Sequence, residues 1–275
     1  MTKSINCKGE LISFDQPKIM GIINITPDSF YEGSRHTQVN EIYKQVDKML
    51  SEGADFIDIG GYSSRPGADN ISTQEELDRV VPIIEKVAKS FPQSHISVDT
   101  FRSEVARQAL ENGAAIVNDI SAGHLDDNMM SVVREYQVPY IMMHMKGTPQ
   151  TMKSLNQYED LITDIKYYFS ERIEKANKLG INDIIIDPGL GFAKNIDQNF
   201  EILSRLGNFD DINYPLLIGL SRKSMIYKTL KTTPQEALNG TTALNMLALD
   251  KGASLLRVHD VKQAVECRRL FSCMN

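Results

Sequence analysis

The sequence has few cysteines and no long apolar run, and both shortages restrict where the protein can work. Its three cysteines, Cys7, Cys267 and Cys273, cannot build a disulfide framework and form no CxxC pair, which favours a reducing compartment. The longest apolar runs, such as Ile19–Ile23, are far shorter than the roughly 20 residues that a membrane span needs. The first residues lack the apolar core of a signal peptide. We therefore expect a cytoplasmic protein with no membrane partner.

A surplus of basic charge is also missing. Lys and Arg number 30 against 36 Asp and Glu, so the net charge is −6 and a strongly basic nucleic-acid face is not expected. The chain has no Walker A sequence, HExxH motif, Cys/His zinc set or nucleophile elbow. Lys194 stands where a dinucleotide fingerprint beginning at Gly189 would need its third glycine. These absences exclude the commonest sequence signatures of nucleotide, zinc and serine-hydrolase sites.

What the sequence does have is a repeated pattern of a short apolar run, a polar loop and a longer amphipathic stretch. The runs are largely β-branched and almost continuously apolar, as strands buried on both faces should be. They are 19–24, 56–60, 96–99, 115–118, 140–144, 184–187, 216–219 and 255–259. Eight strand–helix units in 275 residues predict an α/β protein with one (β/α)8 TIM barrel spanning 1–275. A doubly wound open sheet is the alternative.

Segments around the predicted strands have signals of their own. Helical periodicity fills the gaps, for example over 42–50 and 77–87, and Thr73–Glu76 resembles a capping box. Residues 1–18 precede the first unit, and within them the stretch 5–14, with Lys8-Gly9 as its turn, predicts a short N-terminal hairpin at the bottom of the barrel.

Polar side chains gather at the carboxyl ends of the apolar runs. In a barrel these ends meet on one face, where the active site lies. The residues are Asn24, Ser64, Arg65, Asp99, Asn118, His144, Asp187, Lys223, Arg257 and His259. We therefore expect them to line one pocket, although any single one could simply begin a loop.

The basic members of this set suit an anionic ligand. Arg65, Arg257 and His259 offer donors that match phosphate oxygens. Arg257 could instead form a structural ion pair inside the barrel, and His259 could be a core histidine bonded to the backbone. Asp58 lies within a strand and is expected to be structural, as a partner for Arg257 or Lys223.

The acidic and amide members suit a flat heterocycle. Asp99, Asn118 and Asp187 bring hydrogen-bond acceptors and Lys223 brings a donor, as a pterin or guanine-like ring would require. Asp99 could instead cap a helix beginning near residue 101, and Asp187 could only form a turn. Asn24 offers a neutral oxygen for Mg²⁺, an ion that keeps several waters and takes other ligands from substrate phosphates.

Together and in this order, the motifs resemble bacterial dihydropteroate synthases over nearly the whole chain. The matching segments are Met20–Phe30, Asp58–Gly67, Ser97–Thr100, Val117–Ile120, Met143–Met145, Asp187–Phe192, Ser221–Ser224 and Arg257–Asp260. The resemblance implies a pterin-binding TIM barrel and a transferase of folate biosynthesis. The reaction it implies joins p-aminobenzoate to 6-hydroxymethyl-7,8-dihydropterin diphosphate and yields 7,8-dihydropteroate and pyrophosphate. It also implies Mg²⁺ as cofactor, sulfonamides as inhibitors and a homodimer.

The same resemblance implies a role for each site residue. The pterin would contact Asp99, Asn118, Ile120, Met143, Asp187, Phe192, Gly219, Lys223 and Arg257. The diphosphate would contact Asn24, Ser64, Arg65, Arg257 and His259, with Asn24 also on the metal. The p-aminobenzoate site would be bordered by Phe30, Ser64, Pro66, Arg222 and Ser224. The residues expected to act in catalysis are Lys223, Arg257, Asp99 and Asp187.

Two departures from the family pattern and two rival functions complete the expectations. Tyr31–Arg35 and Ser64 replace the more usual residues near the p-aminobenzoate site and bear on sulfonamide sensitivity. A pterin-dependent methyltransferase with the same barrel would share the ring contacts, but it would not need the motifs at 26–30, 63–67 and 221–224. A catalytically inactive pterin-binding protein would not need the basic residues of the site.

Overall fold

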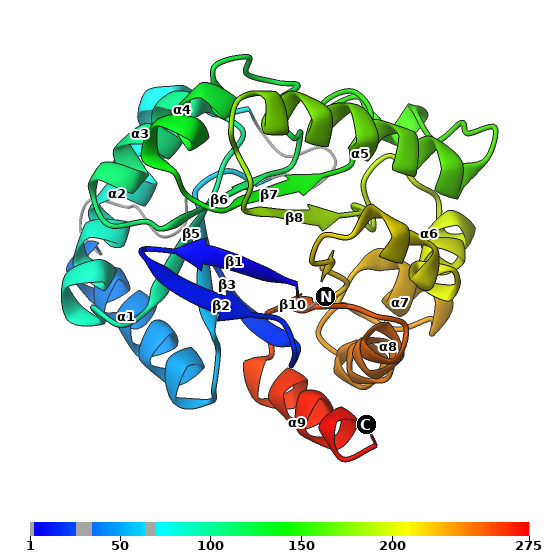
Figure 1. The fold of residues 1–275 in the computed structure, drawn as a ribbon. Coiled ribbons are helices and arrows are strands. Elements are labelled where there is room, and N and C mark those ends of the chain that lie inside the picture. Colours follow the sequence, from blue (N-terminus) through cyan, green and yellow to red (C-terminus); the bar gives the residue numbers. More distant parts are fainter. Residues whose placement is uncertain (1–2, 26–34, 64–69, 275) are drawn as a thin grey trace.

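Eight parallel strands stand at the centre of the molecule, and helices surround them (Figure 1). The computed structural model describes residues 3–25, 35–63 and 70–274, with the backbone alone at 35–38. The barrel strands are β3 (Lys18–Asn24), β4 (Phe56–Gly60), β5 (His95–Asp99), β6 (Ile116–Asp119), β7 (Tyr140–Met143), β8 (Ile184–Asp187), β9 (Leu217–Ile218) and β10 (Leu255–Val258). Each lies within a residue or two of an apolar run expected from the sequence.

The strands close into a barrel. Their order is β8-β7-β6-β5-β4-β3-β10-β9, and every pair of neighbours is parallel. The two ends meet through a parallel bridge between Ile186 and Leu216, where the Ile186 amide donates to the Pro215 carbonyl at 3.0 Å. The predicted TIM barrel is therefore confirmed, and the open-sheet alternative is wrong.

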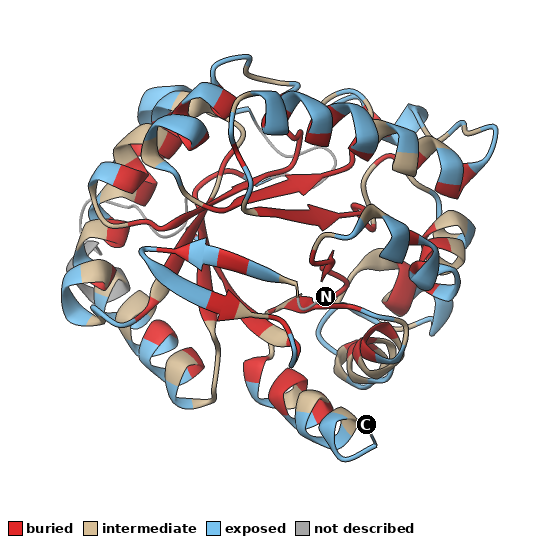
Figure 2. Cartoon of the chain, in the orientation of Figure 1, coloured by how far each residue is buried: buried red, intermediate tan, exposed pale blue. Residues whose placement is uncertain are grey.

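The outer layer consists of helices that follow the strands in sequence. They are α1 (Arg35–Ser51), α2 (Thr73–Ser90), α3 (Ser103–Glu111), α4 (Met129–Tyr136), α5 (Leu161–Lys178), α6 (Ile196–Ser204), α7 (Ser224–Thr229), α8 (Leu238–Asp250) and α9 (Val261–Ser272), with short 3₁₀ turns at Met152–Ser154 and Leu206–Ile212. Figure 2 shows that the strands are buried and that the helices bury only their inner faces. None of the described helices is long and apolar enough to cross a membrane.

The start of α2 differs from the sequence prediction. The N-cap is Ser72, whose hydroxyl accepts a hydrogen bond from the Glu75 amide at 3.1 Å, and Thr73 is already the first helical residue. The predicted capping box beginning at Thr73 is therefore wrong by one position. A hydroxyl precedes the helix at both positions, so the sequence alone does not distinguish them.

The N-terminal hairpin is present and closes one end of the barrel, the end that faces the viewer in Figure 1. Strands β1 (Ser4–Cys7) and β2 (Glu10–Ser13) pair antiparallel around a two-residue turn. Lys8 and Gly9 both have positive φ, 52° and 82°, as a type I′ turn requires. The inner hairpin side chains join one apolar cluster with residues from the barrel strands.

The barrel interior changes character along its axis. Alternate residues of a strand point to the same side, so positions two apart on each strand share the interior. The layer beneath the hairpin is apolar and includes Met20, Phe56, Ile116, Ile141, Ile185, Leu217 and Leu255. Two residues further along most of these strands stand Asp58, Asn118, Met143, Asp187, Gly219 and Arg257. The fold therefore places a layer rich in polar and charged side chains directly above an apolar floor.

Candidate active site

Arg257 lies at the centre of the site, between two carboxylates. Its Nε donates to Asp58 Oδ2 and its Nη2 donates to Asp99 Oδ2, both at 2.6 Å. The same Asp58 oxygen accepts a hydrogen bond from Asn118 Nδ2 at 3.0 Å. Four strands, β4, β5, β6 and β10, thus bring residues that are far apart in sequence into one connected group.

The charges in this group shift one another's ionisation. Burial raises the pKa of Asp99 to about 7; Arg257 opposes the rise, and Asp58 adds to it. Burial lowers the pKa of Arg257, but Asp58 and Asp99 outweigh that effect and leave it above its usual value. Arg257 is therefore always charged, whereas Asp99 gains and loses its proton near neutral pH.

A second charged pair is formed by Asp187, at the end of β8, and Lys223, in the loop between β9 and α7. Burial lowers the pKa of Lys223 to about 8, and the carboxylate of Asp187 opposes that shift. Burial also raises the pKa of Asp187, against the effect of Lys223. Lys223 Nζ donates to the Leu190 carbonyl and lies 5.0 Å from the centre of the Phe192 ring. Both groups are thus poised to change charge closer to neutrality than free side chains.

The structure also tests the alternative roles that the sequence left open for Asp187, Asp99 and Arg257. Asp187 Oδ1 accepts from the Gly189 amide at 2.7 Å, so it does form the turn as well as face Lys223. Asp99 does not cap a helix, because α3 begins at Ser103 and its N-cap residue is Arg102. Arg257 does form ion pairs inside the barrel, and Asp58 is its partner as expected.

Apolar side chains lie beside the charged groups. Ile120, Met143 and Ala193 belong to one buried cluster against which Phe192 packs. A Cβ atom at Gly219 would lie 3.8 Å from Arg257 Cβ, so this glycine sits directly beside the arginine. The predicted pterin-contacting residues are therefore brought together, in a site that offers both polar and apolar surfaces.

The residues after β9 and β10 divide into two groups. His259 Nδ1 lies 3.1 Å from Ser221 Oγ, and its amide donates to the same hydroxyl at 3.2 Å. Arg222 instead forms a two-point ion pair with Asp260, at 2.8 and 2.9 Å, and also bonds backbone carbonyls before α8. Ser224 is half-buried at the start of α7. In the structure, Arg222 therefore bonds groups that do not belong to the cluster around Arg257.

Four of the predicted residues, Phe30, Ser64, Arg65 and Pro66, lie outside the described residues, as do 31–34. Asn24 is described: it ends β3 and its side chain is exposed. Within the described part of the chain, no group of three or more His, Cys, Asp or Glu could hold a metal ion. An exposed amide oxygen fits Mg²⁺, which commonly takes few protein ligands and completes its shell with water and substrate phosphates.

His144 does not join the group around Arg257. Its side chain is 2% exposed, and its Nδ1 lies 2.9 Å from Lys194 Nζ. Successive strand residues point to opposite faces, so the interior position of Met143 leaves the other face to His144. The expectation that His144 lines the pocket with the other polar residues is therefore wrong.

The sequence gives no signal for three charges around the site, of which Asp119 and Glu76 are buried and Lys194 is partly buried. In the sequence, Lys194 is distinctive only because it breaks a nucleotide motif. Asp119 accepts hydrogen bonds from Ser121, Gly123 and Tyr140 behind the barrel wall. Glu76, on α2, accepts from Thr100, next to Asp99. Their helical or outward positions resemble those of solvated charges, so the sequence carried no signal for their burial.

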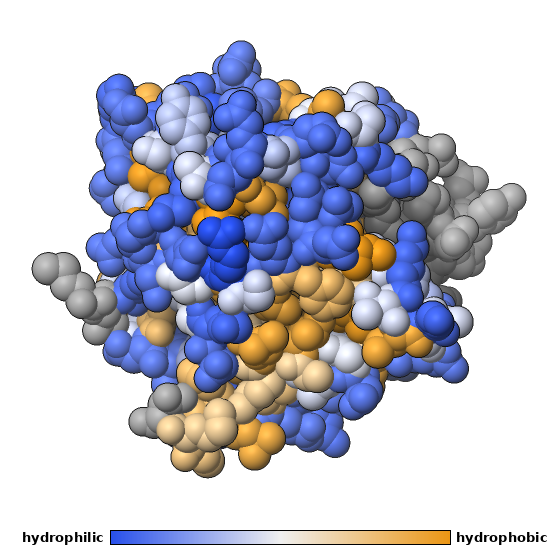
Figure 3. Space-filling model, turned by 90° about the vertical axis from the view of Figure 1, so that its right-hand side faces the viewer, coloured by the Kyte–Doolittle hydropathy of each residue, from blue (hydrophilic) through white to orange (hydrophobic). Residues whose placement is uncertain are grey.

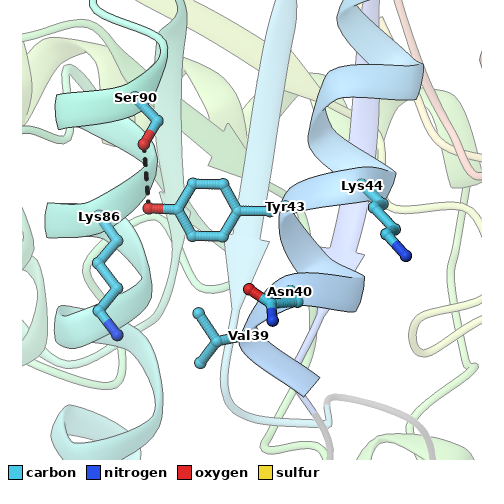
Figure 4. Close-up of a pocket in the computed structure, with 6 residues that line it drawn as sticks. All are labelled: Val39, Asn40, Tyr43, Lys44, Lys86 and Ser90. Atoms are coloured by element: carbon cyan, nitrogen blue, oxygen red, sulfur yellow. Dashed lines mark hydrogen bonds between the residues drawn. The ribbon is translucent and has the colours of Figure 1, made fainter. Parts of the chain in front are cut away.

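A surface hollow between α1 and α2 lies outside the barrel and does not contain these residues (Figure 4). Tyr43 points from α1 towards α2, and its hydroxyl lies 3.1 Å from Ser90 Oγ. Lys44 and Lys86 also line the hollow, but they lie on opposite sides of Tyr43 in this view and do not converge on one anion. The site at the barrel mouth remains the stronger candidate.

Comparison with known proteins agrees with this geometry. Residues 20–259 match the model of a family described as pterin binding enzyme. The chain is 41% identical over 265 residues to the dihydropteroate synthase of Escherichia coli strain K12, covering 96% of this chain and 93% of that protein. The chain belongs to the dihydropteroate synthase family. The family, the enzyme class and the folate-pathway reaction expected from the sequence are thereby confirmed.

Solved structures of the family have the same fold. The Yersinia pestis dihydropteroate synthase in a sulfonamide drug complex superposes with a TM-score of 0.92 at 38% identity, and the match covers 98% of each chain. The Xanthomonas albilineans dihydropteroate synthase with 4-aminobenzoic acid gives 0.91 at 36% identity and covers 100% of this chain and 98% of that one. The family similarity therefore extends over the barrel and its hairpin.

Proposed function

We propose that the mouth of this barrel transfers a pterinylmethyl group from 6-hydroxymethyl-7,8-dihydropterin diphosphate to the amine of p-aminobenzoate. The products are 7,8-dihydropteroate and pyrophosphate. The observation that carries the proposal is the convergence of acceptors and an arginine from five strands, and a lysine from the loop after β9, beside one apolar surface. The family relatives supply the reaction, and the geometry supports the roles proposed below.

The ring of the pterin is the part that these acceptors would recognise. Asn118 donates from Nδ2 to Asp58, so we expect its amide oxygen to serve as an acceptor for the ligand. Asp99 and Asp187 add carboxylates for ring N–H and amino groups, and Lys223 adds a donor for the ring carbonyl. Ile120, Met143, Phe192 and Gly219 would lie along the ring.

The bond that breaks joins the ring methylene to a diphosphate oxygen, so the protein must stabilise the departing anion. Arg257 and His259 are placed to do so, with Ser64 and Arg65 expected to assist. Arg257 is held at Nε by Asp58, which leaves its terminal nitrogens to exchange Asp99 for diphosphate oxygens. Mg²⁺, held by Asn24 and the diphosphate, would supply further neutralisation of that charge.

The nucleophile needs little activation. An arylamine is neutral at pH 7 and already carries a free lone pair, so no strong base is required before it attacks. We expect Phe30, Ser64, Pro66 and Ser224 to border it. Arg222 would have to leave Asp260 to reach the same ligand. We expect sulfonamides to compete at this position; the Yersinia pestis relative has been solved in a complex with a sulfonamide drug.

We also propose a homodimer that covers α8. This helix is apolar on more than one side: Ala248 and Leu249 are buried inward, while Leu244 and Leu247 remain partly exposed. A helix that is hydrophobic all round is typically buried all round. Figure 3 shows apolar side chains gathered on the lower part of the face formed by the last helices. Sedimentation of wild type and Leu247→Glu tests this, with a monomeric variant expected.

The free thiols fit a cytoplasmic location. The cysteines Cys7, Cys267 and Cys273 are unpaired, and free thiols persist best in a reducing compartment. We therefore propose that the protein works in the cytoplasm, which fractionation of cells that express it would test.

One assay separates the proposed reaction from its rivals. Purified protein receives the pterin diphosphate, p-aminobenzoate and Mg²⁺, and both dihydropteroate and pyrophosphate are measured. Formation of the two products in equal amounts supports the proposal. Methyl transfer from a methylated folate without those products would support the methyltransferase, and pterin binding without any product would support an inactive binder. Asp187→Ala serves as the control that should lose activity.

A further inference from the structure

We infer that Lys194 is a positioning residue for the pterin site, fixing the loop 187–194 from behind through a hydrogen-bonded contact with His144. The inference rests on the proposed function, because the loop carries Asp187 and Phe192. Lys194 itself touches none of the groups around Arg257 and has no part in the chemistry described above. Its role would be to keep the pterin slot in shape before the substrate arrives.

Lys194 is surrounded by acceptors. Its Nζ lies 2.9 Å from His144 Nδ1, 3.1 Å from the Gly189 carbonyl and 2.9 Å from the Phe192 carbonyl. An ammonium group has three donors, and here each donor has one acceptor. The contact therefore joins both ends of the segment 189–192 to the residue that follows β7.

The three contacts of Lys194 hold in either of its ionisation states. Burial lowers the pKa of Lys194 well below its usual value, and Asp187 opposes that shift. Burial keeps the pKa of His144 well below its usual value, so its ring is neutral and has one N–H donor and one acceptor nitrogen. An ammonium would donate to all three partners, with the imidazole proton on Nε2; a neutral amine would donate to the two carbonyls and accept from Nδ1–H. The inference therefore rests on the three partners of Lys194 and not on its charge.

Two tyrosines extend the contact to a cluster that supports the slot. Tyr158 donates its hydroxyl to the Ala193 carbonyl at 2.9 Å. Tyr168 donates to the carbonyls of Ser121 and Met143, at 2.9 and 3.1 Å, and its ring packs against that of His144. Around Lys194, the backbones that carry Ile120, Met143 and Phe192 are thus tied together from the outer side.

The loop itself fits closely against β7. Gly189 has a φ of +70°, and a Cβ atom there would lie 2.1 Å from the His144 carbonyl oxygen. On the inner side, Lys223 donates to the carbonyl of Leu190, within the same loop. Lys223 therefore holds the loop on the side of the proposed ligand, and Lys194 holds it on the outer side. Without Lys194, the contact of Lys223 with the loop would remain and the contact with His144 would be lost.

The experiment compares Lys194→Met with Lys166→Met, in which a lysine of α5 that pairs with Asp211 outside the site is changed in the same way. The pterin diphosphate KM of Lys194→Met should rise about tenfold, because the slot loses a hydrogen-bonded support. The p-aminobenzoate KM should stay within about twofold, since that ligand is bordered by other loops. Calorimetry with the pterin diphosphate should show the same loss. Lys166→Met should match wild type in all measurements.

His144 provides a second route if Lys194→Met does not fold. His144→Asn keeps an acceptor near the position of Nδ1 and should retain most of the pterin affinity, whereas His144→Leu removes it and should lose as much as Lys194→Met. An unchanged pterin KM in both Lys194→Met and His144→Leu, or an equal rise of both KM values, would overturn the inference alone. A wild-type protein that neither binds the pterin diphosphate nor makes dihydropteroate would overturn the proposed function and this inference together.

Discussion

The floor and the mouth of the barrel are built from the same strands, yet they differ in almost every physical property. Phe56 and Leu255 lie in the apolar floor, and Asp58 and Arg257 follow two positions later on the same strands. The floor is apolar and covered by the hairpin, whereas the mouth holds buried charged groups. A step of two residues, roughly 7 Å along a strand, separates the apolar floor from the proposed site.

The buried ion pairs of the mouth add little to the stability of the fold, because such pairs recover little more than the cost of removing their charges from water. Asp58 illustrates the point. Its side chain is fully buried, and its Oδ1 has no hydrogen-bond partner among the described residues. An apolar side chain would avoid that cost. The carboxylate is therefore better explained by what it does to Arg257 and Asn118 than by stability.

The largest effect should come from breaking the floor. Phe56→Ala removes a fully buried ring from the apolar cluster, which should cost about 3–5 kcal/mol of unfolding free energy. The pterin diphosphate KM of the protein that remains folded should change by less than about twofold. Denaturant unfolding and steady-state kinetics check the two halves. A normal stability, or a KM that rises with the loss of stability, would contradict the division between floor and mouth.

A substitution at the centre of the mouth should have the opposite effect, changing catalysis more than stability. Arg257→Ala should lower kcat by about 100- to 1000-fold, because the departing diphosphate loses its principal cation. The matched control is Arg268→Ala, since Arg268 of α9 forms its own 2.6 Å bond with Asp55, just before β4. That variant should keep kcat within about twofold. A turnover of Arg257→Ala that matches the control would refute the role of Arg257.

The next effect concerns the ring rather than the leaving group. Asp187→Ala and Lys223→Ala should each weaken pterin binding by about 1.5–3 kcal/mol, the usual worth of a hydrogen bond to a charged group. Lys8→Ala is the control at the hairpin end of the barrel, where Lys8 Nζ donates to the Gly113 carbonyl at 3.0 Å. Calorimetry measures all three. Wild-type pterin affinity in both mouth variants would show that this pair does not hold the ring.

The fold was open to prediction from sequence because its signals are local. Short apolar runs mark the strands, and a two-residue turn at Lys8-Gly9 marks the hairpin. The site followed from one further rule, that the carboxyl ends of barrel strands meet. That rule correctly brought together Asp99, Asn118 and Arg257, although Arg257 is 158 residues from Asp99.

The features that the sequence did not predict depend on which face of a strand a side chain points to and on partners that are distant in the sequence. His144 and Met143 are neighbours at one strand end, and only the register of the strand decides which of them enters the barrel. Lysine is typical of protein surfaces, yet Lys194 is partly buried and bonds carbonyls that no sequence pattern reveals. Arg222 stands in the right motif, yet Asp260 engages it in the structure.

The smallest effect should be in the pH dependence of the mouth. The proposed recognition of the pterin requires Asp99 to be ionised, which holds above its pKa of about 7, and Lys223 to be charged, which holds below its pKa of about 8. The value of kcat/KM for the pterin diphosphate should therefore rise as pH increases through about 7 and fall above about 8, since it reports the free enzyme. Asp99→Asn should flatten the acid limb and Lys223→Arg the alkaline one. Lys8→Ala, which changes the hairpin turn at the other end of the barrel, should keep both limbs of the pH profile. If both limbs persist in Asp99→Asn and Lys223→Arg, they would be assigned to ionisation of the substrates instead.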